Sequence, residues 1–161
     1  MQRITPFLWF DNNAEEAVQL YTSIFPNSSI GKTSRYDENS SKASGQPEGA
    51  VMVMSFTLDG QEFSALNGGP IFKFTEAISF AVSCETQEEV DHYWNTLSEG
   101  GSEGQCGWLK DKFGVSWQIV PNALGTLMSD PDPKKAQAVM AAMLQMTKIE
   151  IANLQEAYNN A

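Results

Sequence analysis

The thiol of Cys106 is the side chain of this sequence best suited to chemistry. Cys106, Trp108 and Lys110 alternate along a segment that reads as a strand, so all three would share one face. A nearby ammonium group lowers a thiol pKa and favours the nucleophilic thiolate. Cys106 is therefore a candidate catalytic residue, and the competing interpretation is a small buried strand residue. Cys84 reads as a core residue.

Aromatic side chains form a second candidate set. Phe7, Trp9 and Trp108 could together make a wall that suits a planar or apolar ligand. The same side chains would also serve as ordinary core packing, and the sequence leaves both interpretations open.

Polar, uncharged side chains form a third set. Thr5, Asn67, Ser79 and Gln118 could supply the few hydrogen bonds that orient a small ligand in a pocket. Each could equally satisfy a backbone group. The only histidine, His92, lies off the apolar face of its helix, so we expect it in solvent and predict no metal ligand there.

These candidates are positioned by strands and helices that the hydrophobic periodicity predicts. We expect two amphipathic helices, one from about Asn13 to Ile24 and one after Thr86, and a C-terminal helical tail that begins at Asp132 and breaks near Thr147-Lys148. The polar stretch from Asp37 to Glu48 reads as a surface loop. The predicted strands are Ile4–Phe10, Ser29–Tyr36, Ala50–Leu58, Gln61–Asn67, Ala77–Cys84, Gln105–Lys110 and Val115–Pro121.

The strand–helix unit occurs twice. Ala17, Tyr21 and Ile24 recur as Val90, Trp94 and Leu97 at a constant displacement. We therefore predict an α+β fold in which two βαβββ modules, residues 1–70 and 76–121, form a curved mixed sheet around a cavity within one domain of residues 1–161. Residues 130–161 form the helical tail.

Strand alternation assigns side chains to the two faces of each sheet. In the first strand, Ile4, Leu8 and Phe10 should face the helix, and Thr5, Phe7 and Trp9 the cavity. In the fifth strand, Ile78, Phe80, Val82 and Cys84 should face the helix, and Ser79 the cavity. In the last strand, Ser116, Gln118 and Val120 should face the cavity.

The composition excludes several functions. The chain of 161 residues carries 20 acidic and 10 basic side chains, a net charge of −10. Such a chain repels phosphate backbones and anionic lipid surfaces, so we expect no nucleic acid and no membrane as partner. The start of the sequence lacks signal-peptide features, so we expect a cytoplasmic protein with free cysteines.

Five segments that span nearly the whole chain carry a family resemblance: Ile4–Ser28, Phe56–Pro70, Glu76–Gly101, Gly104–Pro121 and Asp130–Ile151. The sequence resembles the vicinal oxygen chelate superfamily of glyoxalases, bleomycin-resistance proteins and extradiol dioxygenases. Within it, the sequence is similar to the PhnB-like branch labelled 3-demethylubiquinone-9 3-methyltransferase. The resemblance implies a glyoxalase-like fold and a homodimer.

The resemblance also locates the positions from which metal-dependent relatives take their ligands. Those positions fall at about Thr5, Ser64 or Ala65, Ala77 and Gln118, and of these residues only Gln118 could bind a metal. A stable divalent site needs several imidazole, thiolate or carboxylate donors. We therefore expect no metal and no cofactor.

Three functions follow as alternatives. The first is a metal-free protein that binds a small aromatic or apolar molecule. The second is an enzyme, either the methyltransferase of the family label or a lyase or isomerase. The third is sequestration of a drug or stress compound, as in bleomycin-resistance proteins. The segment after the first strand, Asp11-Asn12-Asn13, lacks the glycine-rich loop of typical S-adenosylmethionine enzymes.

Overall fold

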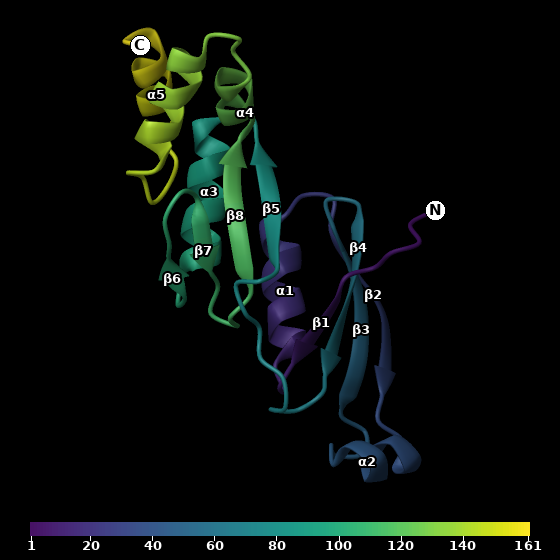
Figure 1. The fold of residues 1–161 in the computed structure, drawn as a ribbon. Helices are drawn as coiled ribbons and strands as arrows, with labels where there is room; N and C mark the ends of the chain where they lie inside the picture. The colour runs from purple at the N-terminus through teal and green to yellow at the C-terminus, as the bar shows by residue number, and fades with distance from the viewer. The chain divides into compact units, whose positions relative to one another are not determined.

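The computed structural model describes residues 1–161 and divides into two compact units, residues 1–73 and residues 74–161 (Figure 1). The fold is α+β, as predicted, with one four-stranded mixed sheet in each unit. The predicted cavity around which the two sheets would curve stays a prediction. No helix of the structure is both long and apolar enough to cross a lipid bilayer.

The first unit is a βαβββ module with an added helix. Its sheet has the strand order β1-β4-β3-β2, in which only the β1–β4 pair is parallel. The elements are β1 (Phe7–Phe10), α1 (Ala14–Ile24), β2 (Ser29–Arg35), α2 (Glu38–Ser44), β3 (Val51–Leu58) and β4 (Gln61–Asn67).

Helix α1 packs its apolar side on this sheet. Tyr21 is fully buried and stacks on Phe56 of β3 with ring centroids 6.4 Å apart, and Phe56 stacks on Phe63 of β4 at 5.3 Å. The β3–β4 hairpin turns at Asp59 and Gly60, whose φ angles are 46° and 79°. Positive φ at both turn residues is the geometry of a two-residue hairpin, and the turn lies between the predicted strands Ala50–Leu58 and Gln61–Asn67, as the sequence indicates.

The second unit repeats the topology. Its sheet has the order β5-β8-β7-β6, and again only the pair formed by the first and last strands is parallel. Leu97 of α3 is fully buried, and Trp117 and Ile119 of β8 form the opposing core. The elements are β5 (Ser79–Cys84), α3 (Gln87–Ser98), β6 (Ser102–Glu103), β7 (Trp108–Lys110), β8 (Ser116–Pro121), α4 (Asn122–Met128), α5 (Pro133–Met143) and α6 (Ile151–Asn159).

The two modules differ by one residue where the first strand meets the helix. The parallel pairs end at Phe10 with Asn67 and at Cys84 with Pro121. Two residues separate Phe10 from the helix cap Asn13, whereas Glu85 alone separates Cys84 from the cap Thr86. The constant displacement in sequence that relates α1 to α3 therefore does not relate β1 to β5.

This difference corrects the matching of the first strands. Counted back from the strand ends, Thr5 corresponds to Ser79, whereas the resemblance placed the corresponding positions at Thr5 and Ala77. In the same match, Phe7 pairs with Ser64 where Ala81 pairs with Gln118.

The predicted loop from Asp37 to Glu48 contains helix α2, so that prediction is wrong. Asp37 caps the helix: its carboxylate accepts a hydrogen bond of 2.7 Å from the backbone N–H of Ser40. Gly45 ends the helix in the left-handed region. None of its residues is buried, so α2 has no hydrophobic pattern that periodicity could detect.

Two apolar residues assigned to the helix-facing side lie outside the strands. Ile4 precedes β1 and is 86% exposed, and Ile78 precedes β5 and is 74% exposed. The other assignments on these strands are confirmed for Leu8, Phe10 and Cys84, which are buried.

The C-terminal helices pack together in a core of their own. Its buried residues come from α4, from α5, from the segment before α6 and from α6 itself. In that order they are Leu127, Val139, Ile149 and Leu154. Asp132 caps α5 with its carboxylate, and the chain breaks between α5 and α6 as predicted. Helix α4 was not predicted.

Candidate functional site

Helix α3 covers one face of the second sheet; the face that α3 does not cover is called the open face below. Helix α3 covers the side to which Leu109, Trp117 and Ile119 point, and all three are buried. The alternating residues Trp108, Lys110, Ser116 and Gln118 therefore lie on the other face. The strand register sets two rows across it: Ser79, Ser116 and Lys110 in one, and Ala81, Gln118 and Trp108 in the next.

The structure brings together three of the predicted ligand-binding residues on this open face. Gln118 donates a hydrogen bond of 2.9 Å from Nε2 to the hydroxyl oxygen of Ser79. Trp108 is the direct cross-strand neighbour of Gln118. The three side chains thus form a continuous surface that is part aromatic and part polar.

A cavity of about 140 Å³ opens beside these residues. Ser116 lines it with only 2% of its surface exposed, and its Oγ has no hydrogen-bond partner. Lys110 also lines it and forms an ion pair with Glu76. The full lining is Glu76, Ser102, Glu103, Gly104, Trp108, Leu109, Lys110 and Ser116.

The chemistry of this cavity is that of an anchor for an oxygen atom. A hydroxyl of Ser116 and the ammonium of Lys110 can both donate hydrogen bonds, and Trp108 adds an apolar surface. The hydrogen bond from Lys110 holds the pKa of Glu76 below its ordinary value, so Glu76 is ionised at neutral pH. A ligand carboxylate or carbonyl oxygen could take the place of the Glu76 carboxylate.

Cys106 does not share the face of Trp108 and Lys110, so that prediction is wrong. It lies in a turn before β7 with φ of 58°, and its backbone N–H donates to Met146 at 2.8 Å. The turn is closed by the Trp108 N–H, which donates to the carbonyl of Gln105 at 3.0 Å. The structure therefore gives no support to an ammonium-activated thiol at Cys106.

The other predicted residues belong to the first unit. Thr5 is exposed before β1, and Phe7 is 59% exposed on β1. Trp9 is half-buried; its indole N–H donates to the Gly69 carbonyl at 2.9 Å, and its ring meets Phe72 edge-on at 4.9 Å. Trp108 is in the other unit, so a single aromatic wall stays a prediction.

Asn67 serves the fold of the first unit. Its Oδ1 accepts from the Ala14 N–H at 2.9 Å, and its Nδ2 donates to Glu15 at 2.6 Å and to the Val51 carbonyl at 3.1 Å. The side chain is buried with its hydrogen-bonding capacity used. Asn67 therefore fixes the start of α1 to the sheet, and we no longer count it as a ligand contact.

Sequence reasoning left out Lys110, Ser116 and Glu76 as ligand-binding candidates. Strand alternation did place Ser116 on the face of Gln118, which was the available signal. Lys110 was considered only as a partner of Cys106. Glu76 comes from the segment before β5, which carries no periodic pattern.

Two modules with the same strand order and the same parallel closing pair define a glyoxalase-like fold of the vicinal oxygen chelate superfamily. A family model described as 3-demethylubiquinone-9 3-methyltransferase matches residues 2–120. The chain belongs to this family, within the PhnB-like branch, so the predicted resemblance is confirmed.

Solved structures agree with this assignment. A PhnB protein from Bacillus cereus, which carries the same methyltransferase description, is 42% identical, with 74% of this chain and 99% of that chain covered and a TM-score of 0.66. Protein PA1353 from Pseudomonas aeruginosa is 20% identical (75% and 98% covered, TM-score 0.60). The fosfomycin resistance protein FosX from Listeria monocytogenes is 16% identical (78% and 94% covered, TM-score 0.53). Among curated proteins none matches.

The superfamily implies a divalent metal, and the donors of this chain do not fit one. The positions that the resemblance implies are Thr5 and Ser64 or Ala65 in the first unit, and Ala77 and Gln118 in the second. Hydroxyl and methyl groups and one amide, which is already bonded to Ser79, are not the imidazole and carboxylate donors that hold such an ion in either unit. Elsewhere too, no group of three or more His, Cys, Asp or Glu side chains could hold a metal.

Proposed function

We propose that this protein binds a small molecule without a metal ion, on the open face of its second sheet. The ligand has an aromatic or apolar body and one polar oxygen. The oxygen binds to the hydroxyl of Ser116 and the ammonium of Lys110, and the body lies against Trp108. The observation that carries this proposal is the buried hydroxyl of Ser116, which lines a cavity and has no partner.

A buried hydroxyl without a partner costs about 1–3 kcal/mol, the free energy of its lost hydration. Almost all buried polar atoms in proteins are paired, so an exception calls for an explanation. Here a ligand oxygen would supply the missing partner, and the cost would be offset when the ligand binds.

Lys110 is available to a ligand because the side chain of its present partner is exposed. The side chain of Glu76 is 63% exposed and that of Lys110 is 38% exposed. Exposed ion pairs contribute little to stability, so exchanging the Glu76 carboxylate for a ligand carboxylate or carbonyl costs little.

The size of the cavity limits what it can hold. A volume of about 140 Å³ is smaller than the roughly 300 Å³ or more of a typical ligand pocket. The cavity therefore anchors one end of a ligand, the ring or the group that bears the oxygen. Trp108 and the Gln118–Ser79 pair continue the surface beyond it.

The test is a titration with benzoate, which combines an aromatic ring with a carboxylate. Cyclohexanecarboxylate and acetate serve as comparisons that lack the aromatic ring or any ring. We expect benzoate to bind best, and Ser116→Ala, Lys110→Met and Trp108→Leu each to weaken binding. Ser34→Ala, at an exposed position of β2 in the first unit, is the matched control.

Benzoate affinity that is unchanged in all three variants would reject the site. Mass spectrometry of small molecules that co-purify with the protein would then identify the natural ligand independently.

Methyl transfer, the reaction in the family description, is the second candidate. S-adenosylmethionine titration by calorimetry separates the two functions: saturable micromolar binding would favour the methyltransferase. We expect none, because the segment after β1 contains Asp11-Asn12-Asn13 in place of a glycine-rich loop.

A further inference from the structure

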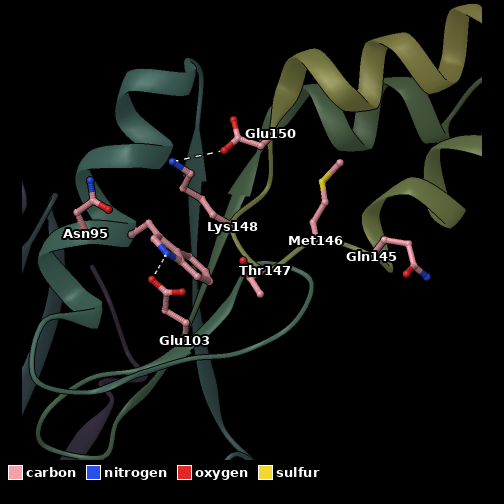
Figure 2. A pocket seen from close by; sticks show the side chains of 8 residues that line it. Asn95, Glu103, Gln145, Met146, Thr147, Lys148 and Glu150 are labelled. Atoms are coloured by element: carbon pink, nitrogen blue, oxygen red, sulfur yellow. Dashed lines mark hydrogen bonds and ion pairs between the residues drawn. The ribbon is translucent and has the colours of Figure 1, made fainter.

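A second hollow lies in the unit of residues 74–161, between α3 and the chain that joins α5 to α6 (Figure 2). Its volume is about 430 Å³, within the range of small-molecule sites. The family model ends at residue 120, so the wall formed by residues 145–150 is outside the family match. The lining residues are Trp94, Asn95, Glu103, Gln145, Met146, Thr147, Lys148 and Glu150.

The wall from residues 145–150 is fixed in place although it is not helical. The carbonyls of Met146 and Thr147 accept hydrogen bonds of 2.8 Å from the backbone N–H groups of Cys106 and Gly107. Both partners belong to the turn before β7. Because backbone hydrogen bonds hold the wall against this turn, the wall is preorganised, and ligand binding would not lose free energy to order it.

Gln87 of α3 fastens the end of the same wall. Its amide donates to the carbonyl of Ile149 at 3.1 Å and accepts from the N–H of Ile151 at 2.8 Å. Both backbone groups are therefore satisfied by one side chain, and the wall is tied to α3 as well as to the turn.

The charges of the hollow favour a cation. Lys148 is its only cationic group, and Lys148 is already paired with Asp91 at 2.7 Å and Glu150 at 3.4 Å. Glu103 accepts a hydrogen bond of 3.1 Å from the indole N–H of Trp94 and forms no ion pair with Lys148. Figure 2 shows Glu103 at one end of the group and Lys148 with Glu150 at the other.

The neutral side chains add acceptors to these carboxylates. Asn95, Gln145 and Thr147 each offer an oxygen that can accept from an N–H group. A ligand rich in N–H donors could bond to Glu103 and to one or more of these oxygens. The net charge of −10 on the chain attracts such a ligand at long range.

We propose that this hollow binds a small organic cation of the diamine or guanidinium class, with Glu103 as its main charged partner. Glu103 also lines the cavity beside Ser116, but none of the other residues of this hollow does, and the proposal does not depend on the function proposed for that cavity. Because five of its eight lining residues follow the family match, it would be a property of chains that carry this tail.

The experiment is a titration of the ¹⁵N-labelled protein with agmatine and with putrescine, followed by the indole N–H resonance of Trp94. The four tryptophan resonances are assigned by single substitutions to Phe. We expect a saturable shift of the Trp94 resonance, because a cation at Glu103 perturbs its hydrogen bond. Succinate, an anion, and 1,4-butanediol, a neutral diol, should give none.

Glu103→Gln should raise the Kd of agmatine about tenfold, since it removes the charge and keeps the shape. Glu48→Gln, an exposed residue of the first unit, should leave the Kd unchanged. The proposal is overturned if neither amine shifts the Trp94 resonance at millimolar concentration, if succinate or butanediol shifts it equally, or if Glu103→Gln leaves the Kd unchanged.

Discussion

The side-chain amide of Gln118 donates a hydrogen bond of 2.9 Å to the hydroxyl of Ser79, across the parallel strands β8 and β5. In the first unit the corresponding residues are Thr5 and Ser64. Here the two polar groups of the second unit satisfy each other. The bonded Gln118–Ser79 pair therefore forms a polar surface next to the cavity that Ser116 lines.

The unpaired hydroxyl of Ser116 leads to a prediction about stability. Ser116→Ala removes a polar group that has no partner and leaves only a small change of volume. We expect the free energy of unfolding to increase by about 1 kcal/mol, because the cost of burying the hydroxyl disappears. Urea denaturation of the ligand-free protein measures the change.

Ser83→Ala is the control for this stability measurement, because Ser83 is exposed. It should change the free energy of unfolding by less than about 0.5 kcal/mol. A loss of stability in Ser116→Ala would mean that the hydroxyl has a partner in solution, and the argument for an anchoring site would fail.

For Asp111 we predict the opposite effect of substitution, a decrease in the free energy of unfolding. It is 2% exposed, and its carboxylate accepts from the N–H groups of Phe113 and Val115 at 2.9 and 3.0 Å and from the Trp117 indole at 2.9 Å. Asp111→Ala leaves two buried donors and one part-buried donor without this acceptor. We expect a loss of about 3 kcal/mol in the free energy of unfolding, measured in urea.

Trp117→Leu and the double variant complete a mutant cycle with Asp111→Ala. The two residues should show a coupling energy of about 1 kcal/mol or more, since they share a charge-assisted hydrogen bond. Additive effects would show that the Asp111–Trp117 contact contributes nothing of its own.

Hydrophobic periodicity was sufficient to predict most of the fold. The spacing of Ala17, Tyr21 and Ile24 identified α1 because those side chains are buried against the sheet. The same reasoning failed for α2, which buries nothing. Its signals are local: a cap at Asp37 and a terminating glycine at Gly45. Periodicity reports burial, and capping must be read separately.

The candidate site was only partly predictable for a related reason. Alternation placed Ser79 and Gln118 on the face toward the cavity, and Trp108 on one face with Lys110, because β-strand geometry is regular. Asn67 looked equally suitable, but its amide bonds to the start of α1, which no local pattern reveals. Cys106 was misplaced because the strand before Trp108 gives way to a turn. Partners that are distant in sequence decided both cases.

The Lys148–Asp91 ion pair predicts how pH affects the docking of the tail. The hydrogen bond from Lys148 lowers the pKa of Asp91 below its ordinary value of 3.8, and the same bond raises the pKa of Lys148 above 10.5. The carboxylate therefore stabilises the fold above its unfolded pKa, and the stabilisation is lost as the pH falls through the folded pKa. The ammonium contribution is lost as the pH rises through the raised pKa.

Asp91→Asn isolates this contribution. The difference in free energy of unfolding between the native protein and this variant should be constant between about pH 5 and pH 9 and should vanish in strong acid. Asp37→Asn is a comparison, because Ser40 lowers the pKa of that carboxylate in the other unit. A difference that persists at low pH would show that Asp91 acts through its shape or its bond to Gln87.

The two cysteines should differ sharply in reactivity. Cys84 is fully buried, and burial raises its pKa to about 11, with a further contribution from the carboxylate of Glu89. Cys106 is partly exposed in its turn. Since alkylation needs an accessible thiolate, iodoacetamide at about pH 8 should modify Cys106 first and Cys84 only after unfolding. Peptide mass spectrometry over time measures both rates. In Cys106→Ser the native protein should take up almost no label, whereas labelling of native Cys84 at a rate similar to Cys106 would contradict the burial of that strand end.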